Sequence, residues 1–235
     1  MGMTNTVNLL TPLSTALLAN SSIYFGEAQP TCTGREVQME TVGAAIAETG
    51  SQWHNGLERN SDKSTRHGMM LPLPMKSMEQ LVTMHSAHRY LLKVDGSVGH
   101  ETFAEFLQGY EPQSDGAGVE TDLFEHYLKH EHYIWNSGRL RSQHSTIELR
   151  SACQQPFQER HTACALNTGI VCAAPELAKL IAQEVGEGSP AVSAMEKWWR
   201  ESLHSGLLAT PPKQGLTTKA LEICSEALQK RGRGE

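Results

Sequence analysis

Residues 134–157 read Ile-Trp-Asn-Ser-Gly-Arg-Leu-Arg-Ser-Gln-His-Ser-Thr-Ile-Glu-Leu-Arg-Ser-Ala-Cys-Gln-Gln-Pro-Phe. Residues 133–140 and 146–153, which cover most of this stretch, are rich in aromatic and β-branched residues. A polar Ser-Gln-His-Ser connection separates the two segments. The pattern predicts two strands joined by a short turn, which is a β-hairpin.

The second strand of this hairpin has two chemically different faces. Because side chains alternate along a strand with a period of two, Thr146, Glu148 and Arg150 share one face. Ile147 and Leu149 lie on the other face. The alternation therefore predicts one charged face and one apolar face.

The charged face suggests a binding site. A carboxylate at Glu148 beside a guanidinium at Arg150 suits a hard cation such as Mg²⁺ together with the phosphate that it bridges. Arg139 and Arg141 bring two more basic groups to the same hairpin. The alternative is an ordinary salt bridge on a solvated sheet, since surface ion pairs are common. Spacing alone leaves both interpretations open.

The aromatic, basic and acidic residues of the hairpin follow the pattern Trp135…Arg139…Thr146-x-Glu148-x-Arg150. This pattern resembles the carboxylate–amine ligases of the glutamate–cysteine ligase type, which share a glutamine-synthetase-like catalytic fold. The family has an Asp two residues before the first Arg, where this chain has Ser137. One active-site contact of the family is therefore altered here.

A second block, Ala-Asn-Ser-Ser-Ile-Tyr-Phe-Gly at residues 19–26, also resembles the family, and Arg35 follows its last glycine by nine residues. The resemblance implies that Arg35 reaches the substrate carboxylate or the transferred phosphoryl group. It also implies substrate-binding roles for Asn20, Ser21 and Trp135. The alternative is that Asn20 and Ser21 only terminate a helix and that Arg35 is a surface residue.

A third block contains the capped helix predicted at residues 102–107 and the Asp-Leu-Phe-Glu-His segment at 122–126, which resembles the family helix before the active-site hairpin. His126, His130 and His132 follow closely, and the first two share a helix face. A zinc site is an alternative use of these histidines, although the HExxH pattern of zinc hydrolases is absent.

The resemblance implies an α+β fold, in which part of the antiparallel sheet of a glutamine-synthetase-like catalytic fold packs with helices. We expect a single domain over residues 1–235, with the sheet and active-site segments in 1–157 and a helical part in 158–235. The chain resembles only the C-terminal half of such a ligase. The segment before Asn20 is too short to hold the additional acidic strands of the family.

The resemblance implies an ATP-dependent ligase that forms an amide through an acyl phosphate. Glu148 would bind Mg²⁺ and Arg150 would neutralise the phosphate, with Arg139 and Arg35 orienting the anionic substrate. ATP, Mg²⁺ and amino-acid substrates are expected, together with a second polypeptide that supplies the missing half. The alternative is a degenerate, non-catalytic binding or scaffolding subunit.

The composition narrows the class of protein. With 20 basic and 26 acidic residues the formal net charge is −6, which argues against nucleic-acid binding. No apolar run reaches the ~18–20 residues of a membrane span, so we expect a cytoplasmic protein without membrane contact. Five cysteines without a CxxC pair favour neither a disulfide framework nor a zinc knuckle.

An apolar sheet edge where the missing half should sit predicts a homo- or hetero-oligomer.

Capping residues and apolar spacing predict further helices that begin near Thr11-Pro12, Ser77, residue 158, Pro175, Pro190 and Thr217 or Thr218. Residues 90–94 are predicted to form a strand, and residues 50–75 a long loop. Helical spacing predicts that Trp198 and Trp199 pack in the core, with a stacking platform for a nucleotide base as the alternative.

Overall fold

The computed structural model describes residues 2–19, 23–24, 27–28, 75–111 without 89, 91, 98 and 100, then 119–134, 137–153 and 155–232. Four of the predicted site residues lie outside these ranges: Asn20, Ser21, Arg35 and Trp135. Most of the predicted loop at 50–75 also lies outside the described residues.

The described residues form mainly helices, with two short antiparallel strand pairs. The helices are α1 (Gly2–Leu9), α2 (Thr11–Leu18), α5 (Met78–Ser86), α6 (Phe103–Gly109), α7 (Val119–His132), α8 (Thr162–Cys172), α9 (Ala174–Glu184), α10 (Gly188–Ser205) and α11 (Leu216–Lys230). The strands are β1 (Ile23–Tyr24), β2 (Glu27–Ala28), β3 (Gly138–Arg141) and β4 (Thr146–Leu149). Three short 3₁₀ turns are η2 (Ser142–His144), η3 (Phe157–Glu159) and η4 (Gly206–Leu208).

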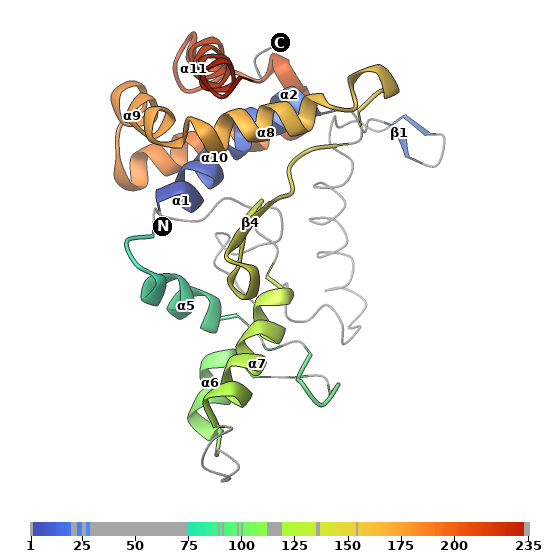
Figure 1. Ribbon diagram of the computed structural model, residues 1–235, viewed down its shortest axis with the longest axis vertical. Coiled ribbons are helices and arrows are strands. Elements are labelled where there is room, and N and C mark those ends of the chain that lie inside the picture. Colours follow the sequence, from blue (N-terminus) through green and yellow to red (C-terminus); the bar gives the residue numbers. More distant parts are fainter. Residues whose placement is uncertain are drawn as a thin grey trace.

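Six helices, α1, α2 and α8–α11, gather at one end of the molecule and are called the helical body below (Figure 1). Its core is apolar because α2 and α8–α11 turn apolar faces inward, and Leu13, Leu177 and Met195 are completely buried. Trp198 and Trp199 are 2% and 0% exposed, so the prediction that they pack in the core is confirmed.

Within the helical body, α8 and α11 approach each other closely. A Cβ atom added at Gly169 would lie 2.9 Å from the Cβ of Cys224 and 3.3 Å from its carbonyl oxygen. The glycine therefore lets the two helices touch at a distance that a larger residue would prevent.

The β3–β4 hairpin lies between the helical body and α5–α7 (Figure 1). Its strands pair with Arg139 opposite Glu148 and Leu140 opposite Ile147. The turn at 142–145 is where the sequence predicted it, and it closes through Ser145 in the left-handed region at φ 51°. Both strands are shorter than predicted. The first strand begins later because residues 133 and 134 continue the helical hydrogen bonding of α7, with their N–H groups donating to the carbonyls of His130 and Glu131.

A side chain from α1 seals the outer edge of β3. The Asn8 Nδ2 group donates to the carbonyl of Gly138 at 2.8 Å, and the Gly138 N–H donates to Asn8 Oδ1 at 3.2 Å. The amide of Asn8 thus makes the two hydrogen bonds that a neighbouring strand would make. This contact fixes the hairpin against the helical body, where Ile147 and Leu149 also pack on the main core.

Helices α5, α6 and α7, called the α5–α7 module below, pack through rings. The contacts join side chains that we call the histidine–aromatic cluster: His85, Tyr90, Phe103, Phe106, Tyr110, His126, Tyr127 and His130. Two predicted caps are confirmed, since Ser77 accepts a hydrogen bond from the N–H of Gln80 and Thr102 forms a capping box with Glu105. The caps predicted at Thr11 and at Thr217 or Thr218 are wrong, because α2 and α11 begin at or before these residues. The strand predicted at 90–94 is wrong, because Lys93 and Gly96 belong to a tight turn.

The antiparallel hairpin and the helical C-terminal part agree with the coarse part of the predicted fold class. The described residues are mostly helical, with far less sheet than the prediction implied, and they do not identify a fold family. Two details differ from the predictions: the sequence did not predict α1, and α2 begins at Thr11 with Leu10 in the cap position. No single described helix is long and apolar enough to cross a membrane. The segments Phe157–Cys172 and Ala174–Glu184, bent by 78° at their junction, meet that requirement only together.

Candidate functional site

Three arginines surround one carboxylate on the face of the hairpin that points away from the core; we call this surface, formed by Arg139, Arg141, Glu148 and Arg150, the arginine face. Arg139 donates to Glu148 Oε2 from Nε at 2.9 Å and from Nη2 at 2.5 Å. Arg150 donates from Nη1 to Glu148 Oε1 at 2.9 Å, and Arg141 Nη1 lies 3.5 Å from Oε2. Three positive charges around one negative charge leave the arginine face with a net charge of about +2.

The register of the hairpin creates this arrangement. Arg139 lies directly across from Glu148. Arg141 is two residues after Arg139, and Arg150 is two residues after Glu148, so all four side chains share a face. The hydrogen bond from the Arg150 N–H to the Ser137 carbonyl, at 2.9 Å, extends the pairing beyond β4 and holds Arg150 in line.

The three arginines differ in exposure. Arg139 is 4% exposed, and its Nη1 also donates to the carbonyl of His132 at the end of α7, at 2.7 Å. A cation at that position suits the negative end of the helix dipole. Arg150 and Arg141 are 18% and 29% exposed, so they reach solvent while Arg139 fixes the carboxylate between them.

The arginines also keep the carboxylate ionised. Desolvation alone would raise the pKa of Glu148, but the hydrogen bond and charge of Arg139, with the charges of Arg150 and Arg141, lower it below its ordinary value. Partial burial, followed by the charges of Arg139 and Arg141, lowers the pKa of nearby His132. At neutral pH the arginine face therefore keeps its excess of positive charge.

The turn of the hairpin is anchored to α7 by a buried acid. The Glu131 carboxylate accepts from the Ser142 N–H at 2.9 Å and from the Ser142 hydroxyl at 2.5 Å. Glu131 is 2% exposed, so these two hydrogen bonds compensate for its burial. The hairpin turn, which follows Arg141 of the arginine face, is therefore fixed against α7.

The described residues do not form a magnesium or zinc site by themselves. None of them belongs to a group of three or more His, Cys, Asp or Glu side chains placed to hold a metal ion. Both oxygens of Glu148 already accept hydrogen bonds from arginines. The zinc alternative is not supported, because His126 bonds to the Tyr90 hydroxyl and His130 bonds to the carbonyl of His85.

The arginine face matches the sequence prediction in part. The structure brings together Glu148 and Arg150, as side-chain alternation predicted, and the strand register adds Arg139 to them. Arg141 was recognised as a basic residue but given no role, although its two-residue spacing from Arg139 already placed it on the same face. Asn8 and Glu131, which hold the hairpin, were missed, because their contacts depend on packing between distant segments.

A scan of protein-family models finds none that matches this chain, and a search of curated proteins finds no significant relative.

Proposed function

We propose that this chain is the arginine-bearing part of an ATP-dependent carboxylate–amine ligase of the glutamate–cysteine ligase type, with a partial glutamine-synthetase-like fold. The observation that carries the proposal is the arginine face, where three guanidinium groups share one carboxylate and two of them reach solvent. The face has an excess of positive charge that an anionic substrate would neutralise.

Guanidinium groups suit the anions of this reaction. Each presents five N–H donors in a planar fork that matches a carboxylate or a phosphate oxygen pair. Arg141 contacts Glu148 at 3.5 Å through one nitrogen, so it can turn toward a bound anion at little cost. Arg150 lies on the other side of Glu148 and completes a two-sided clamp.

In the proposed reaction, the substrate carboxylate attacks the γ-phosphorus of ATP, which forms an acyl phosphate and releases ADP. An amine then attacks the acyl carbon, which forms the amide and releases phosphate. Arg150 neutralises charge on the transferred phosphoryl group, and Arg141 assists from the opposite side. Arg139 is a positioning residue, since its hydrogen bonds hold Glu148 and the end of α7.

Phosphoryl transfer of this kind depends on charge neutralisation by metal ions as well as by arginines. Because the described residues alone do not fit a magnesium site, the proposal needs metal ligands from elsewhere in the chain or from a second polypeptide. The substrate contacts proposed for Asn20, Ser21, Arg35 and Trp135 are likewise predictions from the resemblance.

A second candidate is a non-catalytic binding or scaffolding subunit. The observation that favours it is the saturation of Glu148, whose two oxygens are both engaged by arginines. A network whose hydrogen bonds are made within the protein can hold the hairpin and α7 together without binding any ligand.

The test is amine-dependent ADP release from ATP and glutamate, measured with a panel of amino acids as the amine and with any copurifying polypeptide retained. We expect Arg150→Ala to lower the rate about 10²–10³-fold, as loss of a charge-stabilising donor does in other enzymes, and to lower the folding stability far less. Arg160→Ala is the matched control, because Arg160 is exposed and stacks on Phe157. Absence of release from folded protein would favour the scaffolding subunit.

A further inference from the structure

A groove of about 970 Å³ lies between the helical body and the α5–α7 module. Its walls come from α1, from α5 with the residues before it, from α9, and from the turn that leads into α10. Figure 1 shows α1 between α5 on one side and α9 on the other. None of the residues of the arginine face lines this groove, so it is a separate site.

The interior of the groove is apolar. Leu9, Met84, Ile181 and Val192 line it, and they come from four different helices. The volume falls within the ~300–1,000 Å³ of typical small-molecule sites, whose walls are also mostly apolar. Met84 adds an unbranched, flexible side chain that adapts to ligands of different shape.

Three polar side chains of the wall are already used within the protein. Asn5 makes a two-point contact with the backbone of Met75, donating to its carbonyl and accepting from its N–H, both at 2.8 Å. Thr6 donates its hydroxyl proton to the Gly2 carbonyl at 3.0 Å, and Gln80 Oε1 accepts from the Lys76 N–H at 2.8 Å. A ligand inside the groove would therefore be held by apolar contacts.

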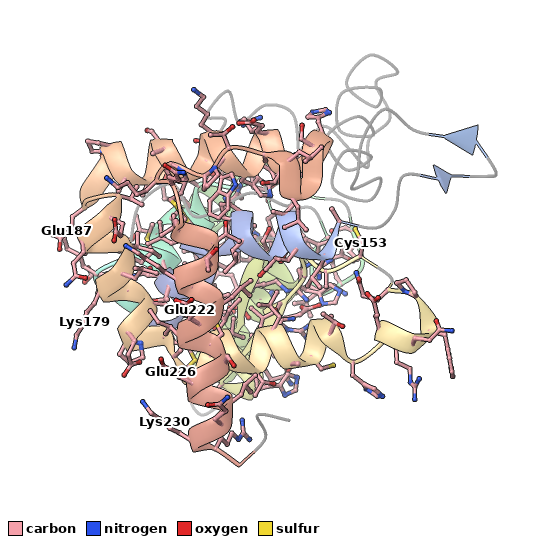
Figure 2. All side chains as sticks on the ribbon, turned by 90° about the horizontal axis from the view of Figure 1, so that it is seen from above. Cys153, Lys179, Glu187, Glu222, Glu226 and Lys230 are labelled. Atoms are coloured by element: carbon pink, nitrogen blue, oxygen red, sulfur yellow. The ribbon has the colours of Figure 1, made fainter. Side chains whose placement is uncertain are left out.

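Among the described residues that line the groove, the charged side chains lie at the exposed rim. These are Lys76, Glu79 and Glu187, which are all exposed and together carry a net charge of −1. Figure 2 shows Glu187 at the outer edge of the molecule, near the turn between α9 and α10. A negative rim attracts a cationic group and repels a carboxylate or phosphate.

From these observations, we propose that the groove binds a small amphiphile with an aliphatic chain and a single ammonium group. The chain lies along the apolar interior, and the ammonium group lies at the rim beside Glu79 and Glu187. Occupation of the groove would link the helical body to the α5–α7 module, because both contribute walls.

The first experiment compares three probes with the same chain: dodecylamine, dodecanol and dodecanoate, below micelle-forming concentrations. Titration calorimetry on the full chain at low salt measures each affinity. We expect dodecylamine to bind at least about threefold more tightly than dodecanoate, with the ratio approaching one in high salt because exposed charges are screened. Equal or tighter binding of dodecanoate at low salt would overturn the proposal.

The second experiment blocks the groove. Ala178 lines it from the exposed side of α9, so Ala178→Trp should weaken dodecylamine binding at least about tenfold by occupying its volume without disturbing the core. The neighbouring Lys179 is exposed, lies outside the lining and is visible at the edge of Figure 2, which makes Lys179→Trp the matched control. Unchanged affinity in folded Ala178→Trp protein would locate binding elsewhere and refute the proposal.

The third experiment removes the rim charge. Glu79→Gln with Glu187→Gln should abolish the preference for dodecylamine over dodecanoate, whereas Glu222→Gln on α11, away from the groove, should retain it (Figure 2). A preference that survives the double change would contradict the role of the rim. Arg150→Ala should leave amine binding unaltered, so failure of this proposal and failure of the ligase proposal are distinguishable.

Discussion

In the helical body the buried side chains are mostly aliphatic, with Trp198 and Trp199 at the centre, whereas the α5–α7 module packs through histidine and other aromatic rings. Among the described residues, the small apolar cluster at the module has Met75 and Leu81 as its buried members, with Leu140 of β3 packed against them. Figure 1 shows the module projecting from the body beyond the hairpin. The difference indicates that the stability of the body depends on apolar burial. The stability of the module also depends on its buried histidines remaining unprotonated.

The clearest example in the module is His130, which is 1% exposed and stacks on Phe103 with ring centroids 4.6 Å apart. Its Nε2–H donates to the carbonyl of His85 at 2.7 Å and so caps the end of α5. Among the described residues, its buried Nδ1 has no hydrogen-bond partner. Protonation of Nδ1 would bury a charged donor without an acceptor, which is costly.

The largest expected effect concerns the core of the body. Trp199→Ala should lower the free energy of unfolding by about 3–5 kcal/mol, because it removes a fully buried indole and leaves a cavity. Denaturant unfolding followed by circular dichroism measures the loss, with exposed Lys197→Ala as the control. A loss below about 1 kcal/mol would mean that the core rearranges freely, contrary to tight packing.

Acid should distinguish the two regions. Burial, then the charges of His130 and His88, lowers the pKa of His85 to about 3, and burial lowers the pKa of His130 to about 4 despite its bond to His85. The folded state therefore stays neutral where the unfolded state binds protons, so stability falls as pH drops below about 6.5 and continues to fall until the folded-state pKa values are reached. The loss is about 2 kcal/mol per histidine at pH 5.

The measurement for this acid effect is hydrogen exchange, corrected for intrinsic rates, at pH 7 and pH 5. Amides of α7 should lose protection at pH 5, while those of α10 keep it. Replacing His130 with Gln, which can retain the bond to the His85 carbonyl without titrating, should reduce the pH sensitivity of α7. Equal loss of protection in both helices would contradict the separation of the two regions.

Two glycines provide a smaller, matched comparison. Gly169→Ala in the body should cost about 1–3 kcal/mol, since the new Cβ would meet Cys224 at 2.9 Å in a packed interface. Gly109→Ala in the module meets no atom within 4 Å and should stabilise α6 by about 0.4–1 kcal/mol through reduced chain entropy. Melting temperatures of the two variants should move in opposite directions. Melting temperatures that shift in the same direction would show that the free space around the added Cβ does not explain the difference between the two sites.

The smallest effect tests a local signal in the module. Thr102→Ala removes the capping box with Glu105 and should cost about 1 kcal/mol. The loss should appear in hydrogen exchange of α6 before it appears in α10, because the cap touches neither the core nor the hairpin. Loss of protection throughout the chain would show that the two regions unfold as one unit.

Local sequence signals predicted a large part of the fold and half of the candidate site. Ser77 and Thr102 cap helices as predicted, because each cap is closed within three residues. Side-chain alternation was sufficient to place Glu148 and Arg150 on one face, whereas the position of Arg139 opposite Glu148 depends on the register between the strands. The predicted strand at 90–94 failed, because Tyr90 is buried in the histidine–aromatic cluster and the chain turns between Lys93 and Gly96, so tertiary contacts override strand propensity.

By itself, the sequence determined the features that depend on neighbours along the chain: the hairpin turn, the caps at Ser77 and Thr102, the charged face of β4 and the apolar faces of α8–α11. Only the tertiary structure decided the contacts between distant segments. Asn8 seals the edge of β3 across 130 residues, and His130 caps α5 across 45 residues. Propensity and periodicity act within a few residues, whereas these contacts depend on which surfaces the packed helices bring together.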